Sequence, residues 1–275
     1  MSVFACPVCG QKLDKLEKVY LCPEGHSYDI ASEGYVHLLS PNKMHAKVPG
    51  DCKEMVSARR RFLEAGYYGL FSDRLNALVL EYAGKSPVLL DAGCGEGYYT
   101  GGVERFLSES GGRPSVFGFD ISKYAVKAAA KKYKRIDFAV GSMFGIPVLS
   151  GAADCVTDVF APIVPEELFR VLRPGGVMIL AVPGERHLFG LKELLYDEPY
   201  ENEHKETEYP GFTFLRREAV RGEITVSGGS VRDLFAMTPY YWKTPVEGSK
   251  RLERVRELKT EIAFDFIFYR KTENG

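Results

Sequence analysis

Residues 88–100 decide the fold of this chain, and they read V-L-L-D-A-G-C-G-E-G-Y-Y-T. An apolar run of strand-forming residues ends at Asp91, a glycine-rich turn follows, and the next residues can start a helix. This order is typical of a buried parallel strand that delivers a ligand to its carboxyl end. Glycines in such a turn let the backbone pass close to a bound molecule, because a side chain would block the approach.

The glycine spacing separates this loop from the dinucleotide fingerprint, which has glycine at its first, third and sixth places. Gly93, Gly95 and Gly97 alternate, and Tyr98 occupies the sixth place, which disfavours an NAD enzyme. The D-x-G-x-G-x-G pattern resembles the first motif of the class I S-adenosylmethionine-dependent methyltransferases. The resemblance implies that the turn from Asp91 through Gly93 and Gly95 packs against the amino-acid end of this cofactor. A tight strand-to-helix turn without a ligand is the alternative.

A second carboxylate supports this interpretation. Residues 115–120 read S-V-F-G-F-D and predict another strand, which ends at Asp120. Asp120 lies about one βαβ step beyond the glycine loop, where an acid bonds the hydroxyl groups of a ribose. The alternative role of Asp120 is to cap the following helix, although Ser122 serves this purpose as well.

Strands and helices alternate through the rest of the core. Further strands are expected at 136–140, 154–160 and 177–182, with a helix at 166–172 and an R-P-G-G turn at 173–176. This alternation predicts an α/β fold with a Rossmann-like parallel sheet and right-handed crossovers. Residues 212–226 and 261–270 are expected to add an antiparallel edge, because apolar residues alternate in the second segment.

The end of the fourth strand limits the chemistry. It lacks the N-P-P-Y signature of enzymes that methylate exocyclic amines and the Pro-Cys nucleophile of cytosine C5 enzymes. We therefore expect Cys94 and Cys155 to be small core residues. Asp158 is the candidate proton acceptor, with a bound water as the alternative. His187 follows the fifth strand and is either structural or a ligand contact.

Two other segments remain open to interpretation. Residues 41–85 are a basic helical connection in which Asp51 is a candidate helix cap and Tyr68 either closes over a ligand or packs. Its cationic residues either contact phosphates or form a solvated face, and they are Lys43, Lys47, Lys53, Arg59, Arg60 and Arg61. The aromatic cluster at 238–242, T-P-Y-Y-W, is either core or a wall for base stacking, and we favour core.

Bulk properties narrow the class of protein. A chain of 275 residues has room for a catalytic domain and one small module. No apolar run approaches the roughly 20 residues that span a membrane, and the start lacks a secretory pattern, so we expect a cytoplasmic protein. The net charge of −1 does not indicate nucleic-acid binding, and any such surface must be a local patch.

Residues 1–40 predict a metal module. The pattern C-x2-C, twelve residues, then C-x3-H gives two chelating pairs that suit tetrahedral zinc. Four protein ligands leave no open position, so we expect one structural zinc ion per chain, held by Cys6, Cys9, Cys22 and His26. Such a module either binds nucleic acid or braces its neighbour, and its aromatic residues either pack or stack on bases.

Together these pieces closely resemble the bacterial 23S rRNA guanine-N1 methyltransferases of the RlmA type. The likeness covers nearly the whole chain and rests on C-P-V-C, C-P-E-G-H, E-G-Y-V-H-L-L, P-G-D, A-R-R-R-F-L-E-A-G-Y-Y, D-A-G-C-G-E-G-Y-Y-T, F-A-P, R-P-G-G, P-G-E-R-H-L and M-T-P. It implies a zinc module at 1–40 that helps recognise an rRNA hairpin, a methyltransferase domain at 86–275, and a homodimer. It also implies cofactor contacts at Tyr68, Gly95, Glu96 and His187.

The resemblance predicts methyl transfer from S-adenosylmethionine to N1 of a guanine in a hairpin loop of 23S rRNA. Two other functions stay open from the residues alone. One is a small-molecule methyltransferase with a bracing zinc module. The other is a zinc-containing RNA-binding protein without catalysis, which the intact glycine loop and Asp120 disfavour.

Overall fold

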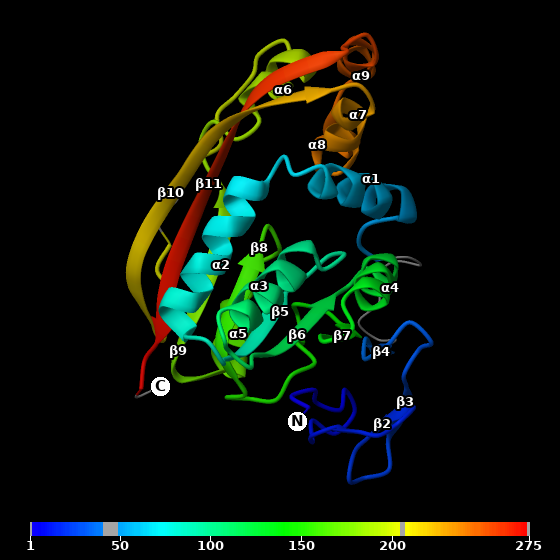
Figure 1. Ribbon diagram of the computed structural model, residues 1–275, viewed down its shortest axis with the longest axis vertical. Coiled ribbons are helices and arrows are strands. Elements are labelled where there is room, and N and C mark those ends of the chain that lie inside the picture. Colours follow the sequence, from blue (N-terminus) through cyan, green and yellow to red (C-terminus); the bar gives the residue numbers. More distant parts are fainter. Residues whose placement is uncertain (1, 41–48, 204–206, 274–275) are drawn as a thin grey trace.

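The computed structural model describes residues 2–40, 49–203 and 207–273 (Figure 1). Its strands are β1 (Asp14–Lys15), β2 (Val19–Leu21), β3 (Ser27–Asp29), β4 (Tyr35–His37), β5 (Val88–Ala92), β6 (Ser115–Asp120), β7 (Asp137–Val140), β8 (Ala153–Val159), β9 (Leu172–Pro183), β10 (Phe212–Ser227) and β11 (Glu257–Lys271). Its helices are α1 (Lys53–Glu64), α2 (Gly69–Ala83), α3 (Tyr98–Glu109), α4 (Lys123–Lys132), α5 (Pro165–Val171), α6 (Phe189–Leu195), α7 (Gly229–Ala236), α8 (Tyr240–Lys243) and α9 (Val246–Glu253).

One mixed sheet of eight strands carries the fold, in the order β10-β11-β9-β8-β5-β6-β7-β4. The strands from β9 to β4 pair in parallel, and β11 and β10 add an antiparallel edge. One buried cluster joins the sheet to α2, α3 and α4, and a second joins its other face to α5 and the N-terminal residues. The predicted Rossmann-like α/β sheet is therefore confirmed.

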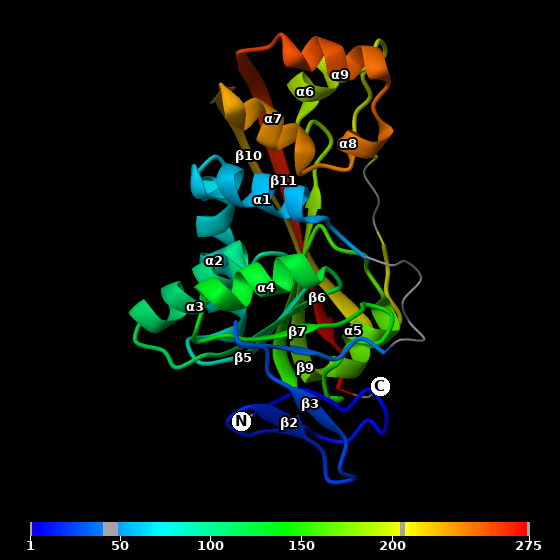
Figure 2. The same ribbon diagram turned by 90° about the vertical axis from the view of Figure 1, so that its right-hand side faces the viewer.

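The N-terminal β1–β3 sheet lies at the opposite end of the molecule from α8 and α9 (Figures 1 and 2). Phe4 fixes it to the main sheet, because its buried ring meets the edge of Phe117 at 5.7 Å and its backbone pairs with Val148. Tyr35–His37 lie within the segment predicted as the metal module, and they form β4 and pair with β7. The core sheet thus extends into the segment predicted as a separate module.

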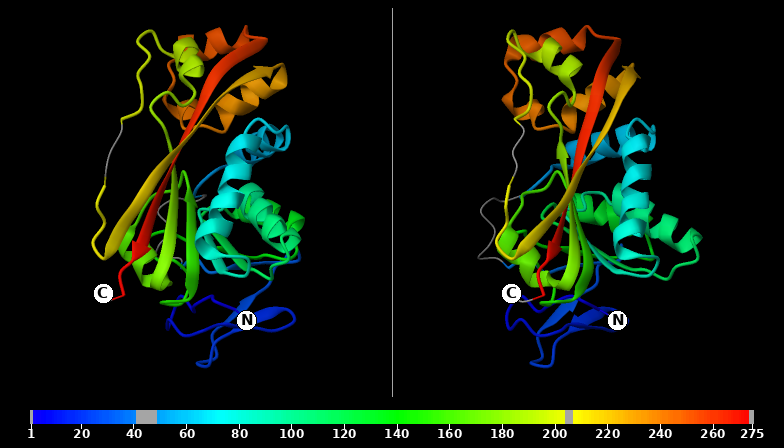
Figure 3. Two further views of the ribbon diagram at one scale, coloured as in Figure 1. Left: turned by 60° about the vertical axis from the view of Figure 1, so that its left-hand side comes forward. Right: turned by 90° about the vertical axis from the view of Figure 1, so that its left-hand side faces the viewer.

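The antiparallel pair of β10 and β11 is the longest strand pairing among the described residues. The two strands pair in antiparallel as expected, with Phe212 opposite Lys271 at one end and Ser227 opposite Glu257 at the other. Both strands extend beyond the parallel strands and reach α6–α9 (Figure 3). The predicted R-P-G-G turn lies inside β9, where Gly175 has a φ of 72° and the register against β8 shifts.

Two predicted helix caps have different outcomes. The hydroxyl oxygen of Ser122 accepts a hydrogen bond from the amide of Ala125 at 3.3 Å, so the cap predicted for α4 is confirmed. The cap predicted at Asp51 is wrong, because α1 follows Cys52 and has no side-chain cap. Among the helices that the structure describes, none is long and apolar enough to cross a membrane.

The aromatic cluster after α7 is not core, contrary to our expectation. Tyr241 is 46% exposed and Trp242 is 68% exposed, and their rings meet edge to face at 5.0 Å. Only the start of the cluster turns inward, because Thr238, Pro239 and Tyr240 line the cavity described below.

Candidate functional site

A cavity of about 590 Å³ opens at the carboxyl ends of the parallel strands. The loops that follow β5, β6, β7, β8 and β9 line it, together with α1 and residues 237–240. This volume lies within the range of small-molecule sites. The structure brings seven predicted cofactor residues together in its lining: Tyr68, Asp91, Gly93, Gly95, Glu96, Asp120 and His187.

The glycine loop forms the floor of the cavity. Gly93 has a φ of 79°, and a Cβ atom there would lie 2.4 Å from the Cβ of Ala161. The amides of Gly93 and Cys94 both donate to the carbonyl of Phe119, at 2.9 and 3.0 Å, which holds the loop against β6. The loop therefore has the close backbone approach that the sequence predicts, and only glycine fits at its first place.

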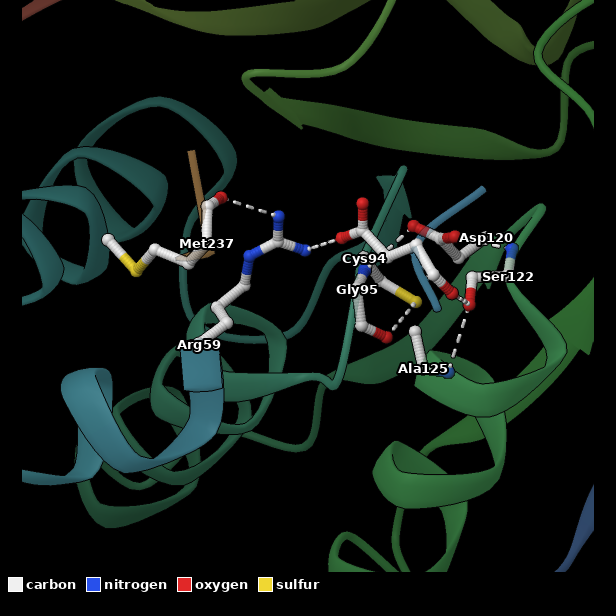
Figure 4. A network of polar contacts seen from close by, with 8 residues as sticks. Arg59, Cys94, Gly95, Asp120, Ser122, Ala125 and Met237 are labelled. Carbon is white, nitrogen blue, oxygen red and sulfur yellow. Dashed lines mark hydrogen bonds and ion pairs between the residues drawn. The ribbon is translucent and has the colours of Figure 1, made fainter. Parts of the chain in front are cut away.

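Asp120 joins the glycine loop to the start of α4 (Figure 4). One carboxylate oxygen accepts from the amide of Gly95 at 3.0 Å, and the other accepts from the amide of Ser122 at 2.7 Å. Burial raises the pKa of Asp120, and these hydrogen bonds and the charge of Arg59 oppose the rise. A carboxylate keeps further lone pairs after two such bonds, so the geometry also fits ribose hydroxyls.

Arg59 reaches the cavity from α1 and lies beside the glycine loop (Figure 4). It forms an ion pair with Asp51, and its Nη2 donates to the carbonyl of Met237 at 3.2 Å. Burial opposes its charge, but the carboxylates of Asp51, Glu96 and Asp120 outweigh burial and raise its pKa. Arg59 therefore joins α1, the cofactor loop and the segment after α7.

This role differs from the phosphate contact considered for the basic segment. Arg60 and Arg61 are also paired, with Glu64 and Asp233 respectively. Lys43 and Lys47 lie outside the described residues. Sequence reasoning missed Arg59 and Met237 as parts of the cavity, although both belong to motifs of the family resemblance, A-R-R-R-F and M-T-P.

Asp91 lies at the end of β5 and is buried. Its two oxygens accept hydrogen bonds from the hydroxyl groups of Thr100 on α3 and Thr157 on β8, the latter at 2.9 Å. Burial raises the pKa of Asp91 to about 6, although these two bonds lower it. Asp91 thus connects the end of β5 to α3 and to β8, beneath the glycine loop.

Near the cavity, the buried carboxylates of Glu96 and Asp158 each keep an oxygen without a hydrogen-bond partner among the described residues. Glu96 lines the cavity, and its Oε1 suits a donor such as the ammonium group of an amino acid. Asp158 does not line the cavity, and its Oδ1 accepts from the amide of Ala161 at 3.0 Å. Burial raises the pKa of Asp158 well above its usual range. Its predicted role as proton acceptor stays a prediction.

Aromatic rings form the end of the cavity nearest β8 and β9. Phe160 directly follows β8, has a φ of 60°, and is 44% exposed. Its ring lies 5.9 Å from that of His187, at an interplanar angle of 34°. The ring centre of Tyr68 also lies 5.9 Å from that of His187. A left-handed backbone at a large residue is strained, and here it holds an aromatic ring at the cavity.

The N-terminal sheet gathers four metal-binding side chains, and their ligand atoms all lie within 4.8 Å of one another. The Sγ atoms of Cys9 and Cys22 are 3.7 Å apart, and Nδ1 of His26 lies 3.6 Å from Sγ of Cys6. A tetrahedral zinc with bonds of about 2.3 Å to sulfur and about 2.0 Å to nitrogen spaces its ligands by similar distances. The four residues therefore fit a zinc ion.

Tyr28 supports this cluster from outside, with its hydroxyl 3.2 Å from Sγ of Cys6. Burial opposes the thiolate form of Cys6, but the bonds from Tyr28 and from backbone amides outweigh burial and lower its pKa to about 6. Metal binding needs the thiolate, so this environment favours coordination.

This fold and cavity define a class I S-adenosylmethionine-dependent methyltransferase with a zinc ribbon. Residues 89–176 match the family described as methyltransferase domain, and residues 4–47 match the family described as RlmA, N-terminal. A 23S rRNA (guanine(748)-N(1))-methyltransferase of Streptomyces fradiae is 30% identical over 270 residues, which cover 94% of each chain. The chain belongs to the RlmA-type family of 23S rRNA guanine-N1 methyltransferases.

Two further similarities cover only part of this chain. A demethylmenaquinone methyltransferase of Bacillus licheniformis is 28% identical over 122 residues, which cover 41% of this chain and 51% of the relative. The solved structure of the YcgJ protein of Bacillus subtilis is 14% identical, with a TM-score of 0.46, and covers 74% of this chain and all of its own. The zinc ribbon distinguishes this chain from a methyltransferase domain alone.

Proposed function

We propose that this enzyme transfers a methyl group from S-adenosylmethionine to N1 of a guanine in a hairpin loop of 23S rRNA. The likeness to the Streptomyces fradiae enzyme over 94% of both chains carries the proposal. The gathering of the predicted cofactor residues in one cavity supports it. A zinc ribbon matched over 4–47 also favours the RNA substrate over a small molecule, since a catalytic domain alone would serve the latter.

The cavity residues have distinct roles in this proposal. Gly93 lets the cofactor approach the backbone, Asp120 holds its ribose and Glu96 its ammonium group. When bound, S-adenosylmethionine supplies the methyl group on a positively charged sulfur. The chain has to hold N1 in line with that methyl group, and such positioning supplies much of a rate enhancement. Phe160 and Tyr68 are placed to hold the flat base, which must leave its stack to enter.

Asp158 is proposed as proton acceptor or as a support for the Phe160–Pro162 loop, and its bond to Ala161 favours the support. The Asp158→Asn variant separates these roles. Loss of a general base lowers kcat by about 10²–10⁴-fold and flattens the pH profile. Loss of a loop support raises KM for RNA and leaves the shape of the pH profile unchanged.

The proposed activity is tested with purified protein, labelled S-adenosylmethionine and a synthetic rRNA hairpin. Digestion of the RNA and mass analysis should find 1-methylguanosine at one loop position. The Gly93→Ala variant is the control that loses the cofactor site. Methyl transfer that needs no RNA would favour a small-molecule enzyme, and hairpin binding without any transfer would favour a silent RNA-binding protein.

We further propose that the enzyme is a homodimer that works in the cytoplasm on its rRNA substrate. The zinc ribbon and the cavity lie at opposite ends of the parallel strands, which favours a second chain in RNA recognition (Figure 1). Sedimentation of the protein with and without the hairpin measures the number of chains in the complex. A single chain bound to RNA at full activity would exclude the homodimer.

A further inference from the structure

Residues 229–256, which include α7, α8 and α9, form a C-terminal cap at one side of the cavity. Thr238, Pro239 and Tyr240 of this cap line the cavity, and Pro239 is also exposed to solvent, so it lies at the mouth. The amide of Trp242 donates to the carbonyl of Pro239 at 3.3 Å. Residues joined by such an i to i+3 bond lie one above the other on the same side of a helical turn. Trp242 therefore lies next to the mouth of the cavity.

Ring contacts hold the side chain of Trp242 in an exposed position. The ring of Tyr241 lies 5.6 Å from that of Phe235, which is buried. The indole of Trp242 meets the ring of Tyr241 edge to face at 5.0 Å, and Trp242 is still 68% exposed. No residue of α8 is buried. The indole is therefore fixed in place, but packing within the chain does not account for it.

The cap also carries positive charge that is not neutralised within the structure. Residues 229–256 contain six basic and three acidic residues, whereas the whole chain has a net charge of −1. Arg251 pairs with Asp197. Among the described residues, the other basic side chains of the cap are exposed and form no ion pair, and they are Arg232, Lys243, Lys250, Arg254 and Arg256.

The basic residues of the two helices α1 and α4 differ in this respect. Arg59, Arg60 and Arg61 of α1 each form an ion pair with a carboxylate. On α4 and just after it, the ion pairs are Lys127 with Glu33, Lys132 with Glu64, and Arg135 with Glu104. A paired cation must leave its carboxylate before it neutralises a phosphate. The unpaired cations of the cap are therefore better suited to bind RNA phosphates.

An unpaired base beside the target guanine fits this combination of ring and charge. When the guanine leaves its stack to enter the cavity, its neighbour loses a stacking partner at the mouth. An exposed indole offers an aromatic face in place of that partner, and such stacking tolerates any base. A second copy of this chain is disfavoured as the occupant, because a symmetric contact would bring two cationic caps together.

We propose that Trp242 stacks on an unpaired base next to the target guanine, while the unpaired cations of the cap bind the flanking phosphates. This inference rests on the proposed function. It gives the hairpin a contact at the end of the molecule opposite the zinc ribbon (Figure 1). Trp242 binds the RNA and takes no part in the chemistry of methyl transfer.

Trp242 is the only tryptophan of the chain, so its fluorescence reports this contact directly. Addition of the hairpin should change the emission and should protect the indole from quenching by acrylamide, because a stacked base covers the ring. Unchanged emission and unchanged protection, at a hairpin concentration that saturates binding in a mobility-shift assay, would overturn the inference. Protection that depends on protein concentration without RNA would assign the indole to a contact with a second copy instead.

Variants of the ring separate RNA binding from catalysis. Trp242→Ala should raise KM for the hairpin by about 10–100-fold, as expected for one lost stacking contact, and should change kcat little. Trp242→Phe keeps a ring and should retain most of the affinity. Phe214→Ala, the control, removes an exposed ring from β10 and should leave KM unchanged. Calorimetry should find the wild-type affinity for S-adenosylmethionine in Trp242→Ala. An unchanged KM in Trp242→Ala would overturn the inference.

Variants of the charge test the phosphate contacts. Lys243→Gln and Lys250→Gln should each lower the slope of log affinity against log salt concentration by about one. Arg60→Gln is the matched control and should change the slope less, because Arg60 is paired with Glu64. A slope that falls only in the control would place the phosphates along α1 and overturn the inference. A hairpin that the wild type neither binds nor methylates would overturn the proposed function itself.

Discussion

Gly93 and Gly95 lie two residues apart in the same loop, but the structure leaves room for a side chain at only one of them. At Gly95 the φ is 54° and the nearest atom to an added Cβ is Nη1 of Arg59 at 3.8 Å. We expect Gly95→Ala to cost about 1–2 kcal/mol of stability, the strain of a left-handed alanine. Gly93→Ala should cost more, because its Cβ also meets Ala161 at 2.4 Å.

Urea unfolding and calorimetry with S-adenosylmethionine measure both effects. Gly93→Ala should lose detectable cofactor binding, since relief of its clash requires the Ala161 loop to move across the cavity. Gly95→Ala should bind measurably, and the larger Gly95→Val should not. Equal losses in the two alanine variants would mean that backbone strain alone matters and that Ala161 adjusts freely.

Asp91 makes stability depend on pH in an unusual direction for a carboxylate. Its pKa is about 6 in the folded chain, above its ordinary value, because burial disfavours the charged form. Folding therefore favours the protonated group. Its contribution is fully present below the unfolded pKa, near pH 4, and is lost as the pH rises through 6. A shift of about two pKa units corresponds to about 3 kcal/mol.

The Asp91→Asn variant tests this sign, because asparagine keeps the shape and the hydrogen-bonding capacity towards the two threonines. The unfolding free energy of the wild type, relative to the variant, should fall by about 2–3 kcal/mol between pH 4 and pH 7.5. Chemical unfolding of both proteins at each pH measures the difference. A difference that rises with pH would mean that Asp91 is charged and stabilised in the fold.

At the level of elements, the sequence predicts those site residues that lie at the carboxyl ends of the sheet strands. Asp91 and Asp120 each end a predicted strand, and the carboxyl ends of parallel strands meet at one edge. Seven predicted cofactor residues therefore share one cavity. Arg59 and Met237 were not predictable in this way, because they lie 178 residues apart and meet only through tertiary contacts of α1.

Two other features at this scale could not be predicted from the sequence, for similar reasons. Tyr35–His37 is too short to carry a strand pattern, and its pairing with β7 depends on the finished edge of the sheet. Aromatic residues at 240–242 indicate burial on average, but a single segment does not say which of its rings faces the solvent. For this reason the prediction that Trp242 is a core residue was wrong, and its side chain is exposed.

Helix α1 provides the test of a contact that the sequence did not reveal. Removal of the Arg59 charge leaves the carboxylates of Asp51, Glu96 and Asp120 near one another without a cation. We expect Arg59→Met to lower the unfolding free energy by about 2–3 kcal/mol at pH 7.5, since breaking a partly buried pair costs more than breaking an exposed one. The loss should be smaller at pH 5, because burial raises the pKa of Glu96 and of Asp120 and their negative charge falls as the pH is lowered.

The matched control is Arg60→Met, which removes a neighbouring arginine whose pair with Glu64 is exposed. It should cost about 0–1 kcal/mol at either pH. Denaturant unfolding of the two variants and the wild type gives the comparison. Losses of the same size at both positions would show that the contacts of Arg59 add nothing beyond a surface pair.

At the scale of the whole molecule, apolar contacts attach the zinc ribbon to the main sheet, and the metal site holds the ribbon in its folded form. Phe4 packs on Phe117, whereas β1–β3 have few buried residues. Removal of zinc by chelation, or Cys22→Ser, should therefore expose the amides of residues 14–29 to hydrogen exchange. Amides of β5 and β6 should remain protected. Protection that persists at 14–29 without metal would contradict a structural zinc.

The position of the ribbon sets the last prediction. Lys15 in β1 pairs with Asp137 at the start of β7, so the ribbon lies at the amino ends of the parallel strands and the cavity at their carboxyl ends. In the proposed homodimer, the ribbon of one chain then serves the cavity of the other. Co-expression of Cys22→Ser and Gly93→Ala chains should recover activity that neither has alone.

The expected recovery is about a quarter of the wild-type activity per chain, because random pairing makes half of the dimers mixed and each mixed dimer has one competent cavity with an intact ribbon opposite it. Methylation of the hairpin by the purified mixture measures it, with the two separate variants as controls. If the ribbon served the cavity of its own chain, every chain in the mixture would carry one defect, and no activity would return.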